Sequence, residues 1–178
     1  MVNTGPIISS NISPADIAAL APRLRRYAVA LVGSISAADD LVQDCMERAL
    51  AHRSSVRDPA RLYSWLLAIL HNMHMSACRR WLRQGVETPV DDLADTLALS
   101  TPPTDRMAVR DLIRAMGQLS DDQRQILLLN GLEGMSYREI ADILDIPVGT
   151  VMSRLARARE KLRILLEGGE QQVVRRIR

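Results

Sequence analysis

Phenylalanine is absent from this sequence of 178 residues, and aromatic residues make up only 3% of it. Hydrophobic residues still account for 47%, so a packed core must be built from Leu, Ile, Val, Ala and Met. These residue types suit helices that pack against helices, whereas a β-sandwich favours aromatic and β-branched residues. The composition therefore favours an all-α fold, at a length that suits one ordinary domain or two small ones.

Cysteine and long apolar runs are also scarce. Cys45 and Cys78 are too few for a disulfide framework, and the chain does not begin with a secretory apolar segment. No stretch approaches the roughly 20 consecutive apolar residues that a membrane-spanning helix needs. We therefore expect a reduced, cytoplasmic protein without membrane insertion.

Neither sign of charge is in large excess, because the formal net charge is only +2. The charges are nevertheless unevenly placed along the chain. One stretch carries negative charges alone, at Glu87, Asp91, Asp92, Asp95 and Asp105. The same stretch is interrupted by glycine and proline at Gly85, Pro89, Pro102 and Pro103. It predicts an acidic flexible linker over 85–106, with a short helix near Leu93 to Leu99.

The linker divides the chain into two small helical domains. We expect a flexible tail over 1–14, a first domain over 15–84, a second domain over 107–168 and a C-terminal tail over 169–178. In the first domain, a serine followed three residues later by an acid predicts a helix start at Ser13-Pro14-Ala15-Asp16 and at Ser36-Ala37-Ala38-Asp39.

A long helix is predicted from about Ala60 to Arg83, because apolar residues recur every three or four positions in it. Its far end is basic, at Arg79, Arg80 and Arg83.

The second domain contains the pattern of a helix-turn-helix unit. Ser120 with Gln123, and Ser136 with Glu139, have the spacing of capping boxes. The turn is Asp145-Ile146-Pro147, and Pro147 suits the first position of the next helix. Apolar residues with helical spacing face the core of that helix, at Val151, Leu155, Ala158 and Leu162. A polar stripe runs beside them, at Thr150, Arg154, Arg157 and Lys161, with Ser153 and Arg159 on its flanks.

Such a helix can lie in the major groove of DNA, with its buried face on the protein. Arginine side chains can pair with guanine O6 and N7 or with phosphates, and hydroxyl groups near the helix start can donate to phosphate. A solvated basic helix in an ordinary bundle is the alternative interpretation.

Two blocks of sequence resemble the extracytoplasmic-function group of the sigma-70 family. The run from Leu119 to Arg163 resembles region 4, most specifically at Pro147-Val148-Gly149-Thr150-Val151, Ser153-Arg154 and Arg157-Ala158-Arg159. Upstream, Ala38-Asp39-Asp40-Leu41-Val42-Gln43-Asp44 resembles region 2.2, and the helix from Ser64-Trp65-Leu66 to Arg80 resembles the −10-reading part of region 2. The resemblance covers about four-fifths of the chain.

The resemblance implies a non-enzymatic sigma factor without cofactors, which binds core RNA polymerase, promoter DNA and an anti-sigma factor in a stress- or signal-responsive regulon. It implies that the −35 element is bound by Ser136, Tyr137, Arg138, Thr150, Ser153, Arg154, Arg157, Arg159 and Lys161. For the −10 element it implies Asn72, Ser76, Arg79, Arg80 and Arg83. For the polymerase it implies contacts to the clamp of the β′ subunit, with a second contact at the β flap, from Asp39, Asp40, Gln43, Asp44 and Glu47.

The sequence departs from the family pattern in places. Met152 stands where a basic residue is common, Ala156 where a bulky residue is common, and Met46 and Leu50 where larger apolar groups are usual. These differences weigh against borrowing a promoter sequence from other members.

Other interpretations remain open at this point. A dimeric helix-turn-helix regulator would need only the second domain, and a helical adaptor that binds an anti-sigma factor would need no DNA. His71, His74 and Cys78 lie on one helix face and could hold a metal ion with a further ligand, but such spacing is more often coincidence, and we predict no metal site.

Overall fold

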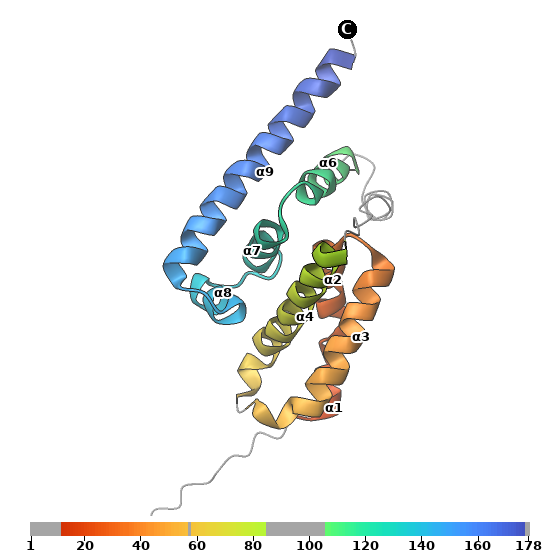
Figure 1. The fold of residues 1–178 in the computed structure, drawn as a ribbon, viewed down its shortest axis with the longest axis vertical. Coiled ribbons are helices and arrows are strands. Elements are labelled where there is room, and N and C mark those ends of the chain that lie inside the picture. The colour runs from red at the N-terminus through yellow and green to blue at the C-terminus, as the bar shows by residue number, and fades with distance from the viewer. Residues whose placement is uncertain (1–11, 57, 85–105, 177–178) are drawn as a thin grey trace, which may run out of the picture.

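The computed structural model describes residues 12–56, 58–84 and 106–176, and the regular elements in these ranges are all helices. The all-α prediction is therefore confirmed. Two groups of helices lie side by side, one on each side of the molecule (Figure 1). The acidic linker charges and the short helix expected near Leu93 to Leu99 lie outside the described residues. Within the described residues, no helix is both long and apolar enough to cross a bilayer.

The first group is a bundle of four helices, α1 (Pro14–Ala19), α2 (Ala21–Val32), α3 (Ile35–His52) and α4 (Leu62–Gln84). Two short 3₁₀ turns, Arg53–Ser55 and Pro59–Arg61, join α3 to α4. Each long helix presents an apolar stripe to the others, and fully buried side chains fill the centre, among them Ile17, Leu24, Leu31, Leu66 and Leu70.

Local sequence explains where these helices begin. The predicted helix start at Ser13 is present and takes the form of a capping box: the Ser13 hydroxyl accepts from the Asp16 amide, and the Asp16 carboxylate accepts from Ser13. The prediction for α3 is wrong by two residues. Its cap is Ser34, whose hydroxyl accepts from the Ala37 amide, because Gly33 ends α2 with a positive φ of 75° and leaves Ser34 extended.

The second group consists of α6 (Arg106–Gly117), α7 (Asp121–Gly131), α8 (Tyr137–Leu144) and α9 (Val148–Arg176). Both predicted capping boxes are present, at the starts of α7 and α8. Asp145 ends α8 in the left-handed region with φ 52°. Pro147 lies one residue before α9 rather than in its first position, and its carbonyl accepts from the amides of Thr150 and Val151.

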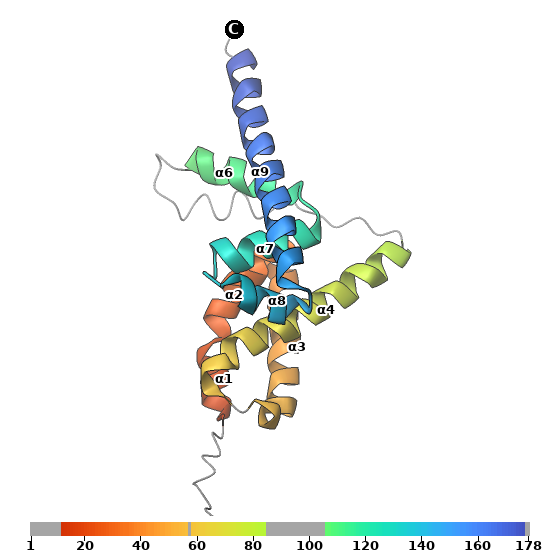
Figure 2. The same cartoon turned by 90° about the vertical axis from the view of Figure 1, so that its left-hand side faces the viewer.

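The last helix is longer than the sequence suggests. Two glycines, Gly168 and Gly169, favour a helix end because each costs about 1 kcal/mol relative to alanine. The helix nevertheless continues to Arg176 where a tail over 169–178 was expected. At 29 residues it is about 44 Å long, and its far half projects from the molecule (Figure 2).

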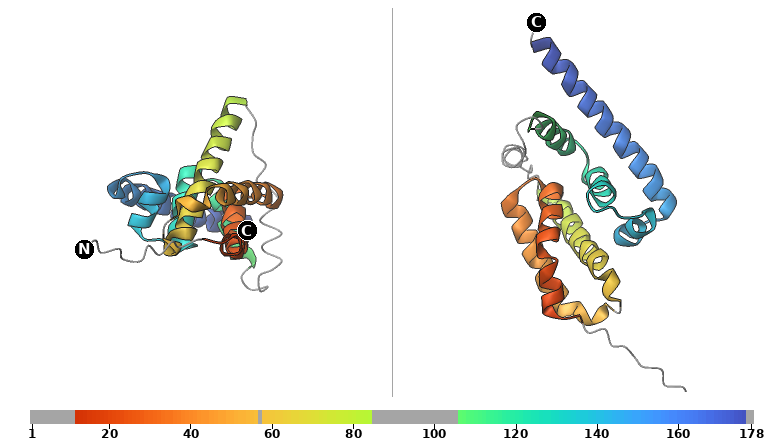
Figure 3. Two further views of the ribbon diagram at one scale, coloured as in Figure 1. Left: turned by 90° about the horizontal axis from the view of Figure 1, so that it is seen from below. Right: turned by 180° about the vertical axis from the view of Figure 1, so that it is seen from behind.

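The two groups share one continuous apolar core. Helix α2 packs against α7, and α4 packs against α8. Buried residues of both groups, including Leu66 and Leu70 of the first and Ile126 and Ile140 of the second, belong to the same hydrophobic cluster. The view from behind shows the same side-by-side arrangement (Figure 3). The free chain is therefore closed, with its two domains in contact.

Polar contacts reinforce this junction. The carboxylate of Glu133, which is fully buried between α7 and α8, accepts from Arg23 of α2 at 2.9 Å. The Arg23 guanidinium also lies over the ring of Tyr63, 3.9 Å from its centroid. Sequence periodicity gave no signal for Glu133, since an acid in a short loop is ordinarily exposed.

Arg124 of α7 is a second polar link between the groups. Its guanidinium donates to four backbone carbonyls at 2.9–3.2 Å, those of Leu31, Met116, Gly117 and Leu119. It thereby caps the ends of α2 and α6 together, which a planar five-donor group can do and an ammonium cannot.

Candidate nucleic-acid and polymerase interfaces

Helix α9 has one packed face and one outward face. Val151, Leu155 and Ala158 are at most 1% exposed, and Leu162 is half-buried, so the predicted apolar stripe lies in the core. The helix packs on α6, α7 and α8 of its own domain. Its opposite face is exposed, including Met152, Ser153, Ala156 and Arg157, and the closed arrangement leaves it on the outside of the molecule (Figure 2).

The predicted polar stripe is not uniform. Arg157 and Lys161 are exposed, whereas Thr150 and Arg154 are half-buried. Arg154 lies 3.5 Å from the carboxylate of Asp122 on α7. The Ser153 hydroxyl donates to the Thr150 carbonyl at 3.1 Å.

Arg159 lies on the other side of α9. At 100° per residue it is about 160° around the helix from Arg157, and it donates to the side chain of Asn130 at 2.7 Å. The structure therefore does not bring Arg159 and Arg157 onto one face. Helical spacing alone already puts Arg159 away from the stripe that it was expected to flank, whereas its partner Asn130 could not be predicted from the sequence.

The start of α8 carries three further predicted residues. Ser136 is committed to capping, since its hydroxyl donates to the Glu139 carboxylate at 2.7 Å and accepts from the Glu139 amide. These hydrogen bonds from Ser136 hold the pKa of Glu139 below its ordinary value. Tyr137 and Arg138 are exposed beside it.

The predicted polymerase-binding residues line the outer side of α3. Asp40, Gln43, Asp44 and Glu47 are exposed, and the Gln43 amide donates to Glu47 at 3.1 Å. Asp39 differs because it forms a two-bond ion pair with Arg25 of α2, at 2.5 and 3.1 Å. The bonds from Arg25 hold the pKa of Asp39 below its usual range.

The predicted −10 residues lie toward the far end of α4. Asn72 and Ser76 are exposed, and the Ser76 hydroxyl donates to the Asn72 carbonyl at 2.7 Å. Arg79 and Arg80 are exposed in the second half of α4. The end of α4 extends past the bundle (Figure 2). Arg83 lies in the last turn of α4.

Two hollows adjoin α4. One, of about 300 Å³, lies between the end of α3 and α4, and its lining includes His52, Trp65 and Asn72. The other, of about 620 Å³, lies where the segment before α4 meets Glu139, Asp142 and Ile143 of α8. Helix α8 and the segment that precedes α4 therefore border the same hollow.

A compact polar cluster lies where α4 meets α7. His74 is buried, and its Nε2 is 3.5 Å from the Cys78 Sγ and 3.9 Å from the Asp121 carboxylate. Burial lowers the pKa of His74 and, with Asp121 beside it, raises the pKa of the Cys78 thiol to about 12. His71 is not part of this group. Asp121 was not predicted here, because 43 residues of sequence separate it from Cys78.

Comparison with known proteins identifies both domains. The family model described as "Sigma-70, region 4" matches residues 110–162, and the model described as "Sigma2 domain of PhyR" matches residues 17–71. The first helical group is therefore region 2 and the second is region 4.

Named relatives match over most of the chain. The EcfG sigma factor of Rhodopseudomonas palustris is 40% identical over 151 residues, which cover 85% of this chain and 83% of that protein. The sigma-E factor of Escherichia coli is 33% identical over 137 residues, covering 69% and 70%.

Two solved structures have a similar arrangement. The sigma factor RpoE from Bartonella quintana, in complex with the anti-sigma factor NepR, matches with a TM-score of 0.73 and 31% identity, over 86% of this chain and 95% of that one. CnrH, in complex with the cytosolic domain of CnrY, matches with a TM-score of 0.59 and 25% identity, over 85% of each chain.

A dimeric helix-turn-helix regulator would need only the second domain, whereas this chain also has a region 2 domain. The matches over most of the chain therefore set that alternative aside. The chain belongs to the extracytoplasmic-function group of sigma-70 family RNA polymerase sigma factors, non-enzymatic proteins that direct transcription initiation.

Proposed function

We propose that this chain carries core RNA polymerase to promoters that have −10 and −35 elements, in a stress- or signal-responsive set of genes under the control of an anti-sigma factor. Region 4 binds the −35 element through α9, and region 2 binds and melts the −10 element through α4. The observation that carries the proposal is the amphipathic character of α9. One face of this helix packs in the core, and the opposite face exposes Ser153 and Arg157.

The −35 contact divides into base and backbone partners. Arg157 and Lys161 extend from the exposed side of α9 toward base edges, while Thr150 and Ser153 lie in its first turns, where the helix dipole favours phosphate. Arg154 reaches DNA once it leaves Asp122. Tyr137 and Arg138 are exposed at the start of α8 and suit the phosphate backbone, while Ser136 positions them as the helix cap. Arg159 lies on the other side of α9 and reaches a phosphate only once it leaves Asn130.

The outer side of α3 is the proposed contact with the clamp of the β′ subunit, and region 4 makes a second contact with the β flap. Asp40, Asp44 and Glu47 present carboxylates to solvent there. Asp39 contributes less, because Arg25 already neutralises it.

The −10 contact combines a basic helix end with a pocket. Arg79, Arg80 and Arg83 meet the DNA backbone, while Asn72 and Ser76 contact the melted strand. The hollow of about 300 Å³ beside Trp65 and Asn72 would accept a base that has left the stack.

Both elements are bound at once only if the domains separate. The segment over 85–105 can reach about 70 Å at roughly 3.3 Å per residue, which matches two elements about two helical turns apart. The closed free chain therefore opens on the polymerase. Because the match to the NepR-bound relative covers 86% of this chain, it includes parts of both domains, which favours the closed form as the one an anti-sigma factor holds.

Transcription in vitro tests the assignment. Core polymerase should initiate selectively on genomic promoter fragments only when the chain is added, and selectivity that is equal without the chain contradicts the proposal. Arg157→Ala should lower −35 binding by about 10-fold to 100-fold, the value of a good base contact. Arg163→Ala is the matched control, since Arg163 is exposed on the same helix but paired with Glu160 and Glu167.

Polymerase capture is tested separately. Reversing Asp40 and Asp44 to lysine should weaken binding to core enzyme, whereas Asp111→Lys on α6 should not. Equal capture of both variants would remove α3 as the clamp contact while leaving the sigma family assignment intact.

A further inference from the structure

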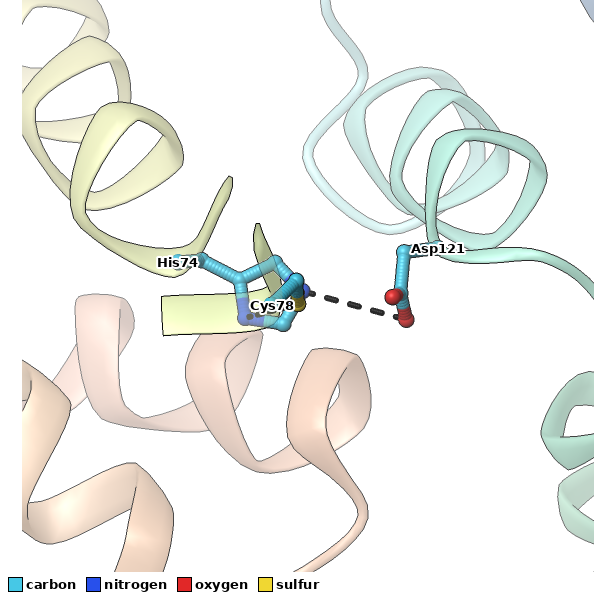
Figure 4. A group of neighbouring side chains, drawn as sticks. All are labelled: His74, Cys78 and Asp121. Carbon is cyan, nitrogen blue, oxygen red and sulfur yellow. Dashed lines mark hydrogen bonds and ion pairs between the residues drawn. The ribbon is translucent and has the colours of Figure 1, made fainter. Parts of the chain in front are cut away.

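The cluster of His74, Cys78 and Asp121 has no part in binding DNA or polymerase as described above. His74 and Cys78 lie one turn apart on α4 of region 2, and Asp121 is the first residue of α7 in region 4. The three side chains point toward one another across the domain junction (Figure 4). One imidazole nitrogen, one sulfur and one carboxylate oxygen all lie within 4.8 Å of one another.

We propose that this cluster is a binding site for a tetrahedral transition-metal dication, with zinc as the best fit, and that the bound metal ties region 2 to region 4 in the closed chain.

The sulfur–nitrogen distance suits zinc. Bonds of about 2.3 Å to sulfur and about 2.0 Å to nitrogen, at tetrahedral angles, place the two ligand atoms about 3.6 Å apart. The Cys78 Sγ and His74 Nε2 are 3.5 Å apart. The corresponding nitrogen–oxygen separation is about 3.3 Å, so the Asp121 oxygen, now 3.9 Å from His74, must move about half an ångström closer. Asp121 is partly exposed and can make that adjustment, and water can take the fourth position.

The donor set also selects the metal. A thiolate with an imidazole suits zinc and similar borderline ions, whereas magnesium and calcium prefer oxygen ligands. The positive charge of Arg124 opposes metal binding, because its guanidinium lies 3.5 Å from the Asp121 carboxylate. That guanidinium is held by backbone carbonyls and stays in place, so the affinity should be lower than that of a four-ligand structural site.

The site has a consequence for opening. Two ligands belong to region 2 and one to region 4, so the complete site exists only while the domains are in contact. A ligand that binds one of two states shifts the population toward that state. The metal would therefore oppose the domain separation that the proposed function requires, although metal binding itself does not depend on that function.

Cobalt(II) titration of the reduced full-length chain tests the site without polymerase. We expect one cobalt per chain, a thiolate-to-cobalt absorption band, tetrahedral visible bands, and displacement by zinc. Cys78→Ser should abolish the thiolate band, and Asp121→Asn should weaken binding at least about 10-fold. Cys45→Ser is the matched control, because Cys45 is a buried cysteine of region 2 outside the His74, Cys78 and Asp121 group, and its replacement can still donate to the Leu66 carbonyl.

Circular dichroism establishes that each variant is folded. The proposed metal site is refuted if the folded wild-type chain shows no thiolate-to-cobalt band, or if that band persists in Cys78→Ser. Cobalt binding that is equal in Asp121→Asn and wild type overturns the bridge between the domains, because region 2 alone would then hold the metal. None of these outcomes bears on the sigma factor assignment.

Discussion

We expect Arg23→Ala to open the closed chain, because it leaves the buried carboxylate of Glu133 without its closest partner. Glu133 is fully buried and Arg23 is 43% exposed, with the two joined at 2.9 Å. Arg26 remains in reach of the same carboxylate, but at 3.9 Å. The substitution also removes the cation–π contact with Tyr63.

The magnitude follows from the burial of the acid. Breaking a buried ion pair by removing one partner costs about 3–5 kcal/mol, and the exposure of Arg23 and the presence of Arg26 favour the lower end. A cost of about 3 kcal/mol multiplies the ratio of open to closed chains by roughly 150, since each 1.4 kcal/mol is a factor of ten. Glu133→Gln should cost less, because the amide oxygen can still accept from Arg23.

Small-angle X-ray scattering of the purified chain measures the change as a larger radius of gyration. The double variant Arg23→Ala/Glu133→Gln provides the sharpest comparison, because it removes the unpaired charge and should be more closed than Arg23→Ala alone. The reasoning fails if Arg23→Ala scatters like wild type, or if the double variant is the more open of the two.

Three further predictions concern stability. Ser34→Ala should lower the free energy of unfolding by about 1 kcal/mol in urea, whereas Ser36→Ala should not, and equal losses would contradict the position of the α3 cap. Arg124→Lys should cost about 2 kcal/mol and lower Tm by about 4–8 °C in calorimetry, and an unchanged Tm would show that the four carbonyl contacts are dispensable. Burial holds the pKa of His74 below the unfolded value near 6.5, so the folded chain is most stable above that pH, where the imidazole is neutral, and loses stability as the pH falls. The free energy of unfolding in urea should therefore decrease from about pH 7.5 to about pH 5.5. His74→Gln should make this decrease smaller.

The sequence predicts best what is decided locally. The helix starts at Ser13, Ser120 and Ser136 depend on residues three apart, and all three are present. The α3 cap was misplaced because Ser34 and Ser36 both suit a helix start, and the left-handed Gly33 decides between them. The apolar face of α9 was likewise found from its spacing, because helical period alone determines which side is buried.

Contacts between the domains could not be predicted in this way. An apolar stripe shows that a helix face is covered, but not by which partner. Glu133 pairs with Arg23 across 110 positions of sequence, and Asp121 meets His74 across 47. Arg154 and Arg159 similarly have partners on α7, which helical spacing does not reveal.

The position of α8 has a consequence for the order of events at a promoter. It borders one hollow with the segment before α4, while Ser153 and Arg157 on the outward side of α9 are exposed. If α9 and α4 bind DNA as proposed, we expect the closed chain to reach an upstream element through α9 first, and to engage the melted strand only after the two domains have separated. On that proposal, we expect the free chain to leave DNA strands paired until polymerase separates its two domains.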